Sequence, residues 1–295
     1  MTEWPLVLFT IALQLACGLS LSATLFDLLS GKPGSPRRIA LAADIEAMRP
    51  LGIAVFPTVT LGLLASLFHL GHPFSALRSL SNLGSSRLSL EILLSLLFAA
   101  AALVYGSLWW RRIIRARLAA GVITSILGVS AVASSFFIYM IPAQPAWNSG
   151  WVPASFLGMI LLFAGIVPAS LLDSADRVFP RIALALTASG ALALAASMLW
   201  TLAALSRSGV DGFSADRLQA GLRALAAGNP VWVGLYLAFS VVLPVAFVFR
   251  SWPGEDSGAP AEPRAFSLKI IVFFSVLAGA IIGRMLMYTL AALPF

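Results

Sequence analysis

Charged residues are scarce in this chain of 295 residues, where Asp, Glu, Lys and Arg together make up 11% of the sequence. A soluble domain carries roughly 25% charged residues, so the composition excludes a water-soluble globular protein. Hydrophobic residues make up 60% of the chain, and the mean hydropathy is +0.95. A bilayer requires about 20 apolar residues per helical crossing and leaves exposed backbone unsatisfied. The composition therefore predicts an all-α integral membrane protein in a lipid bilayer.

Cysteine and histidine are also in short supply. The single cysteine, Cys17, lies within the first apolar run, and one thiol cannot form an internal disulfide or hold an iron–sulfur cluster. The two histidines are His69 and His72, and a haem held between helices would need a histidine on another span. Haem ligation by His69 and a methionine is the remaining, disfavoured arrangement, and zinc or di-iron sites lack ligands. We therefore expect no haem, iron–sulfur cluster or other metal in this chain.

The formal charge of +7 comes almost entirely from arginine. In a soluble protein such a balance would suggest nucleic acid as a partner. Here the basic residues stand in short loops between apolar runs, which is the pattern that controls membrane topology and contacts anionic lipids. We expect no nucleic-acid binding.

Eight apolar runs are long enough to cross a bilayer, and we interpret residues 1–295 as one transmembrane domain. The first run is not expected to be a cleavable signal peptide, because its flank MTEW carries an acid and no base. The predicted spans are 5–28, 50–70, 88–110, 118–141, 151–172, 181–205, 230–250 and 267–291.

The basic residues are distributed unevenly between the two sets of loops. Thirteen fall on one side and five on the other. Because cytoplasmic loops carry the excess of Lys and Arg, this asymmetry predicts a bundle of eight helices with both termini outside. Two outer loops, over 74–84 and 214–228, are expected to form short helices. Each is either a helix lying in the membrane interface or a docking surface for a partner.

Ionisable residues inside apolar spans cost about 2.5–3.5 kcal/mol each, so they are the default functional candidates. His69, Glu91 and Arg284 all fall in the outer halves of their predicted spans. The neutral Gln14 lies roughly three turns into the first span from the same side. Asp27 lies instead at the inner end of that span, and we interpret it as an interfacial residue.

Three of these residues have a polar companion four residues away on the same helical face. These pairs are Thr10 with Gln14, Ser95 with Glu91, and Tyr288 with Arg284. Such pairs are typical of a hydrated or ligand-lined pocket, although Ser and Thr are common in membrane helices.

Proton chemistry is the function that this set of residues favours. An imidazole titrates near pH 6.5, and a carboxyl in a low-dielectric site can titrate near neutrality. A histidine and a glutamate therefore suit a substrate whose hydroxyl protons leave as its electrons do, such as a quinol. The alternatives are that His69 binds a loop carbonyl at the interface, and that Glu91 and Arg284 form a structural ion pair. His72 stands beside Pro73 past the helix end and is expected to shape the outer loop.

The same residues also carry a resemblance to a known family. Four stretches together resemble the DmsC family, the membrane-anchor subunit of bacterial dimethyl sulfoxide reductase-type enzymes. They cover nearly the whole chain, and the second is the most specific. These stretches are EWPLVLFT followed by Gln14, FHLGHPFSALRSLSNLGSSRLSLEIL, WNSGWVP and IIGRMLMY.

The resemblance implies a specific role in a bacterial inner membrane. Such anchors bind and oxidise menaquinol, carry no haem and pass electrons to a ferredoxin-like iron–sulfur subunit and then to a molybdopterin catalytic subunit. The histidine of the family's HLG motif matches His69, and its glutamate matches Glu91. Arg284 matches less specifically, and with Tyr288 and Gln14 it is expected to orient the quinone ring. This chain would then be a quinol-oxidising or non-catalytic subunit of an oxidoreductase complex in anaerobic electron transport.

Three alternatives remain open from the sequence. The first is a permease for a small solute, since Pro57, Pro168 and Pro244 fall in mid-span positions where broken helices could face each other. The second is a purely structural anchor without a quinone site. The third is the anchor of a related enzyme that acts on polysulfide, tetrathionate or sulfite.

Overall fold

The computed structural model describes residues 4–68, 82–83, 86–142, 147–148, 150–171, 178–207, 230–250 and 266–291. Eight helical segments in these ranges are long and apolar enough to cross a membrane. The expected all-α membrane protein with eight spans is thus confirmed. The helices are α1 (Trp4–Leu29), α3 (Ala42–Leu67), α4 (Arg87–Trp110), α5 (Arg117–Tyr139), α6 (Trp151–Leu171), α7 (Val178–Arg207), a seventh span built from three pieces, and α11 (Phe266–Ala291).

The second spanning helix begins well before its apolar run. The sequence predicts a start near residue 50, whereas α3 begins at Ala42. The additional turns carry Asp44, Glu46 and Arg49, and the last two form an i,i+3 ion pair with an N–O distance of 3.6 Å. A hydropathy profile identifies only the part of a helix that is apolar enough to lie in lipid. It therefore does not detect a polar extension of the helix beyond that part. The short helix α2 (Pro36–Ala40) precedes α3, with Ser35 as its side-chain N-cap.

The seventh span is not a uniform α-helix. It consists of α9 (Pro230–Leu237), the π-helical segment η2 (Ala238–Val242) and α10 (Leu243–Arg250). Pro244 has no backbone N–H to donate to the carbonyl four residues earlier, and its ring crowds that carbonyl. A π-helical turn at 238–242 widens the backbone at that position and lets the span continue.

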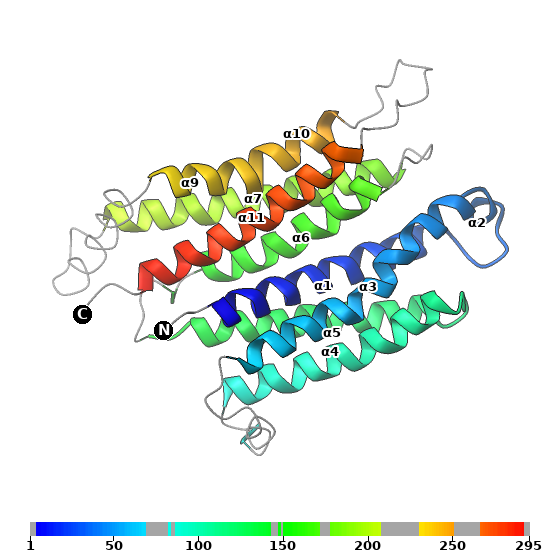
Figure 1. The fold of residues 1–295 in the computed structure, drawn as a ribbon, viewed down its shortest axis with the longest axis horizontal. Helices are drawn as coiled ribbons and strands as arrows, with labels where there is room; N and C mark the ends of the chain where they lie inside the picture. The colour runs from blue at the N-terminus through cyan, green and yellow to red at the C-terminus, as the bar shows by residue number, and fades with distance from the viewer. Residues whose placement is uncertain are drawn as a thin grey trace.

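The helices form two groups that lie side by side (Figure 1). The first group contains α1, α3, α4 and α5, and the second contains α6, α7, the seventh span and α11. Helix α1 packs on α3 and α5 within its own group and on α6 across the boundary. At this boundary a Cβ on Gly18 would lie 2.8 Å from the Cβ of Phe163. Only glycine allows α1 and α6 to approach so closely.

Two ends of the molecule can be distinguished in Figure 1. Helix α1 begins and α11 ends at the same end, called the terminal end below, while α2 lies at the opposite end, called the α2 end. The predicted topology places the terminal end outside. His69, His72 and the predicted helix over 214–228 lie outside the described residues, as does most of the predicted helix over 74–84.

Candidate functional site

Arg284 is a buried cation near the terminal end of α11. Its side chain is only 6% exposed, and its Cζ lies 3.4 Å from the ring centroid of Phe156 on α6. Nη1 donates a hydrogen bond to the sulfur of Met287 at 3.4 Å. The ion pairs that join described residues do not include Arg284. An aromatic face, and not a carboxylate, therefore supports this guanidinium.

Glu91 lies at the same end but binds a different neighbour. It is buried in the second turn of α4, and its Oε1 is hydrogen-bonded to the hydroxyl of Ser135 on α5. The alternative in which Glu91 and Arg284 form an ion pair does not hold in this structure, because each side chain has another partner. The carboxylate and the guanidinium belong to different helix groups and are not directly joined.

The hydroxyl of Ser135 can serve either protonation state of Glu91. Its Oγ also lies 3.2 Å from the carbonyl oxygen of Ala131, and a hydroxyl has one proton to donate. An ionised Glu91 accepts the hydrogen bond that this hydroxyl donates. A protonated Glu91 donates to Ser135, which then donates to Ala131. Glu91 can gain or lose a proton without leaving a buried polar atom unpaired.

A tyrosine pair joins α5, which carries the partner of Glu91, to α11, which carries Arg284. The hydroxyl oxygens of Tyr139 on α5 and Tyr288 on α11 are 2.6 Å apart. Tyr139 follows Ser135 by one helical turn, and Tyr288 follows Arg284 by one turn. The sequence predicted Tyr288 but not Tyr139, whose position against α11 is a tertiary contact with no sequence motif.

A cavity opens beside Arg284 and is called the terminal cavity below. Helices α1, α6, α7, α9 and α11 line it. The lining residues are Gln14, Trp151, Ser155, Met159, Leu194, Ser197, Met198, Thr201, Tyr236, Ala280, Gly283, Arg284, Leu286 and Met287.

Gln14 contributes a buried donor to the terminal cavity. Its side chain is 1% exposed, and its Nε2 has no hydrogen-bond partner among the described residues. Thr10, its predicted companion, instead donates to the carbonyl oxygens of Leu6 and Val7 in its own helix, at 2.9 and 3.1 Å. An unsatisfied amide buried in protein costs roughly 1–3 kcal/mol, and a ligand oxygen in the cavity would remove that cost.

The predicted site residues are thus brought together in part. Gln14 and Arg284, 270 residues apart in sequence, line the same cavity. Glu91 and Tyr288 lie at the same end but are not part of its lining. His69 directly follows Phe68, the residue that caps α3 at this end, and lies outside the described residues.

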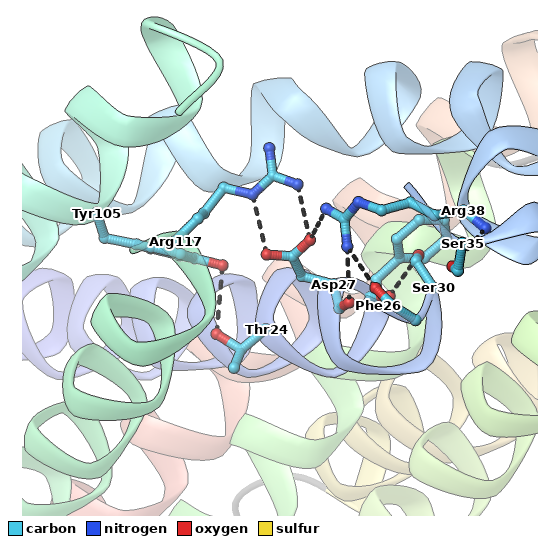
Figure 2. A network of polar contacts seen from close by, with 9 residues as sticks. Thr24, Phe26, Asp27, Ser30, Ser35, Arg38, Tyr105 and Arg117 are labelled. Atoms are coloured by element: carbon cyan, nitrogen blue, oxygen red, sulfur yellow. Dashed lines mark hydrogen bonds and ion pairs between the residues drawn. The ribbon is translucent and has the colours of Figure 1, made fainter. Parts of the chain in front are cut away.

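Asp27 belongs to a separate polar network at the α2 end (Figure 2). Arg117 of α5 donates to it from Nε at 2.9 Å and from Nη2 at 2.7 Å, and Arg38 of α2 donates to the same carboxylate. The guanidinium of Arg117 also stacks over Trp109 at 3.7 Å. Asp27 is 3% exposed and accepts hydrogen bonds from the two arginines on both carboxylate oxygens, so its role is structural.

The chain matches a known family over almost its whole length. A model of the family described as DMSO reductase anchor subunit (DmsC) matches residues 1–290. The chain belongs to the DmsC family. Membership and the eight apolar helices make it a multi-pass membrane protein of the anchor-subunit type.

Three curated relatives in the DmsC family agree with this assignment. In Escherichia coli K12, the YnfH subunit of an anaerobic dimethyl sulfoxide reductase is 26% identical over 294 residues, covering 98% of this protein and 94% of the relative. The C subunit of anaerobic dimethyl sulfoxide reductase from the same strain is 28% identical over 302 residues, with the same coverages. The C subunit from Haemophilus influenzae is 30% identical over 178 residues, or 56% of this protein and 59% of the relative. No solved structure matches.

Proposed function

We propose that the chain is the quinol-oxidising membrane anchor of a dimethyl sulfoxide reductase-type complex. The observation that supports this most directly is the terminal cavity, where the buried donors Gln14 and Arg284 meet without a carboxylate partner. Such donors fit the oxygen atoms of a quinone ring. Glu91 lies at the same end with a hydrogen bond that suits both of its protonation states.

Each predicted residue has a distinct role in this proposal. His69 and Glu91 accept the two protons that a quinol loses, and Gln14, Arg284 and Tyr288 orient the ring. Menaquinol supplies two electrons together with these protons when it is oxidised to menaquinone. Because one cysteine and two histidines offer no site to store an electron, the electrons leave this chain directly for a partner.

Family membership supports the proposed partners. A ferredoxin-like iron–sulfur subunit accepts the electrons at the outer face, and a molybdopterin catalytic subunit uses them to reduce the terminal acceptor in anaerobic respiration. The protein is one transmembrane domain of a bacterial inner membrane, with both termini outside. The anchor of a related enzyme with another terminal acceptor is the nearest alternative, since the catalytic subunit selects the acceptor.

The permease alternative lacks support from the helices. It requires broken helices that face each other at mid-membrane. Pro57 lies within an uninterrupted α3, and Pro168 lies within an uninterrupted α6. Only the span with Pro244 departs from α-helical geometry, among the helices that the structure describes.

The decisive test replaces the predicted proton acceptor in the intact complex. We expect His69→Ala to abolish quinol-driven turnover, because the predicted proton acceptor is then missing. Turnover driven by a reduced viologen dye, which bypasses the quinol, should persist, as should assembly with the partner subunits. Undiminished oxidation of a naphthoquinol by His69→Ala would overturn the assignment of this residue.

A purely structural anchor gives a different result. In that case a quinone would not quench the fluorescence of the complex in a saturable way, and wild-type complex would show dye-driven turnover alone. The same preparation therefore distinguishes a quinol-oxidising anchor from a passive one.

A further inference from the structure

We propose that the terminal cavity binds a small monovalent anion, chloride or an ion of similar size, which accepts hydrogen bonds from the guanidinium of Arg284 and the side-chain amide of Gln14. This inference goes beyond the proposed function, because it concerns what fills the cavity when no quinol is bound. It stands on the buried charge of Arg284, on the buried amide of Gln14 and on the size of the cavity that both line.

Arg284 differs from the other buried arginines of the described residues in what it contacts. Arg38 and Arg117 are 7% and 3% exposed, and both are paired with the carboxylate of Asp27. Arg284 is 6% exposed, and its contacts with described residues are one aromatic ring and one thioether sulfur. Such contacts recover only part of what a guanidinium loses when it leaves water. A negative ligand beside Arg284 would supply the counter-charge that Asp27 supplies at the α2 end.

Three helices contribute hydrogen-bond donors to the terminal cavity. Nε2 of Gln14, on α1, is buried and has no hydrogen-bond partner among the described residues. The guanidinium of Arg284, on α11, has five N–H groups, and it donates to the sulfur of Met287, a weak acceptor. Tyr236, on α9, lines the same cavity, and a phenol hydroxyl can also donate. None of the described residues that line the cavity is acidic, so these donors fit a single negative ion.

Close packing of α11 on the seventh span holds the donors of both around one small cavity. A Cβ at Gly283 would lie 2.6 Å from Cε2 of Tyr236, and a Cβ at Gly279 would lie 2.3 Å from Oγ of Ser240. Two glycines four residues apart thus let the helices approach closely, as small residues do between membrane helices. The ring of Tyr236 therefore lies against the helix that carries Arg284.

The size of the terminal cavity fits a small ion. Its volume is about 40 Å³, and one water needs about 10–15 Å³. The cavity therefore has room for about three waters, or for one chloride-sized ion with a water. A quinol ring does not fit inside it and can reach these donors only with an oxygen at the edge of the ring. Five of the lining residues are Leu or Met, so a singly charged ion is favoured over sulfate or phosphate, whose burial costs more.

The anion and a quinol oxygen would compete for the same protons. Neither Gln14 nor Arg284 can give one N–H group to two acceptors at full strength. We therefore expect chloride to raise the KM of the intact complex for a short-chain naphthoquinol and to leave kcat unchanged. Gluconate, which is too large for the cavity, should have no such effect at the same ionic strength.

The first experiment measures binding without turnover. Chloride replaces gluconate in the buffer of the intact complex at constant ionic strength. The melting temperature should rise in a saturable way, because a ligand that binds only the folded state stabilises it. Bromide should quench part of the tryptophan fluorescence saturably, and Trp151→Phe should remove that part, because Trp151 lines the cavity. If neither signal depends on the anion, water alone fills the cavity and the inference is overturned.

The second experiment fills the cavity. Ala280 lines the terminal cavity and is 3% exposed, whereas Ala183 is 6% exposed and lines a second cavity at the α2 end. Ala280→Leu should abolish the chloride-dependent rise in melting temperature, and Ala183→Leu should leave it unchanged. The reverse pattern would place the anion at the α2 end and overturn the inference.

The third experiment removes the donors one at a time. Arg284→Gln should abolish chloride binding, because the counter-charge is lost. Gln14→Leu should weaken chloride binding roughly tenfold, the effect of one lost hydrogen bond. Chloride binding that is unchanged in both variants would contradict the assigned donors.

Failure of the inference can be told from failure of the proposed function. If wild-type complex does not oxidise naphthoquinol, the proposed function is wrong, whether or not chloride binds. If wild type oxidises naphthoquinol and neither melting temperature nor quenching depends on the anion, the proposed function stands and the anion site is wrong. If chloride binds without changing the KM, the anion site stands and the ring does not use Gln14 and Arg284.

Discussion

Asp27 and Glu91 are both buried carboxylates, but their neighbours give them different capacities. Asp27 accepts hydrogen bonds from two arginines, and Glu91 is paired with the neutral hydroxyl of Ser135. If Asp27 took up a proton, the guanidiniums of Arg117 and Arg38 would be left without their counter-charge. Protonation of Glu91 leaves no cation without a counter-charge, because its partner Ser135 is neutral. A rare ionisable residue in an apolar span therefore marks either a structural ion pair or a reactive site, and only the neighbours decide which.

The structural role of Asp27 can be tested by stability. Asp27→Asn should destabilise the complex by about 3–5 kcal/mol, because it leaves Arg117 and Arg38 buried without a carboxylate. Glu46→Gln is the matched control, since Glu46 also lies between two arginines but its side chain is 50% exposed, and such pairs contribute under about 1 kcal/mol. Thermal denaturation of the purified complex measures both. Equal effects would contradict a role that depends on burial.

Sequence reasoning found one class of residue in the site and missed another. Gln14, Glu91 and Arg284 stand out because amides and charges are rare in apolar spans. Tyr139 and Tyr236 do not stand out, because their positions depend on which helix each ring contacts. A hydropathy profile does not give the order of the helices around a bundle. For the same reason the sequence grouped Glu91 with Arg284, whereas the structure gives each a different partner.

At the scale of elements, α11 shows how packing positions a site. Gly279 and Gly283 face the seventh span, and Arg284 follows the second glycine directly. The eight apolar runs located the helices to within a few residues, except where α3 continues past its run into polar turns. The π-helical segment at 238–242 has no hydropathy signal, although Pro244 marks its position. The apolar runs predict where the helices lie. Irregular turns within a helix, such as the π-helical segment before Pro244, depend instead on local backbone chemistry.

The contact at Gly283 can be tested against a glycine in open space. Gly283→Ala should lower stability by about 1–3 kcal/mol, because its Cβ would overlap the ring of Tyr236. Gly234→Ala, in α9, meets no atom within 4 Å and should raise stability by about 0.5–1 kcal/mol through helix propensity. Melting temperatures of the two variants give the comparison, and a stabilising Gly283→Ala would contradict close packing of α11 on the seventh span.

At the scale of the whole molecule, a cavity lies at each end of the boundary between the two helix groups in the part of the chain that the structure describes. The terminal cavity is lined by polar side chains from five helices, whereas the α2-end cavity has Ser22 as its one polar side chain among the described residues. Both have nearly the same volume. The number of polar side chains, rather than size, therefore distinguishes the proposed ligand site from the other cavity.

The predicted orientation can be tested with single cysteines. The native Cys17 is fully buried and should not react. With both termini outside, Asn148→Cys at the terminal end should react with a membrane-impermeant maleimide in spheroplasts. Lys32→Cys, in the exposed turn before α2, should react only after the membrane is opened. The opposite labelling pattern would reverse the assigned topology.

The network around Asp27 also bears on how the protein is made. The carboxylate belongs to the first span, Arg38 to the short helix that follows it, and Arg117 to the fourth span. During synthesis the first span enters the bilayer long before the fourth has left the ribosome. Until Arg117 arrives, Arg38, eleven residues after Asp27, is the nearer of its two arginine partners in sequence. The residues of this network are therefore all synthesised before the second helix group begins.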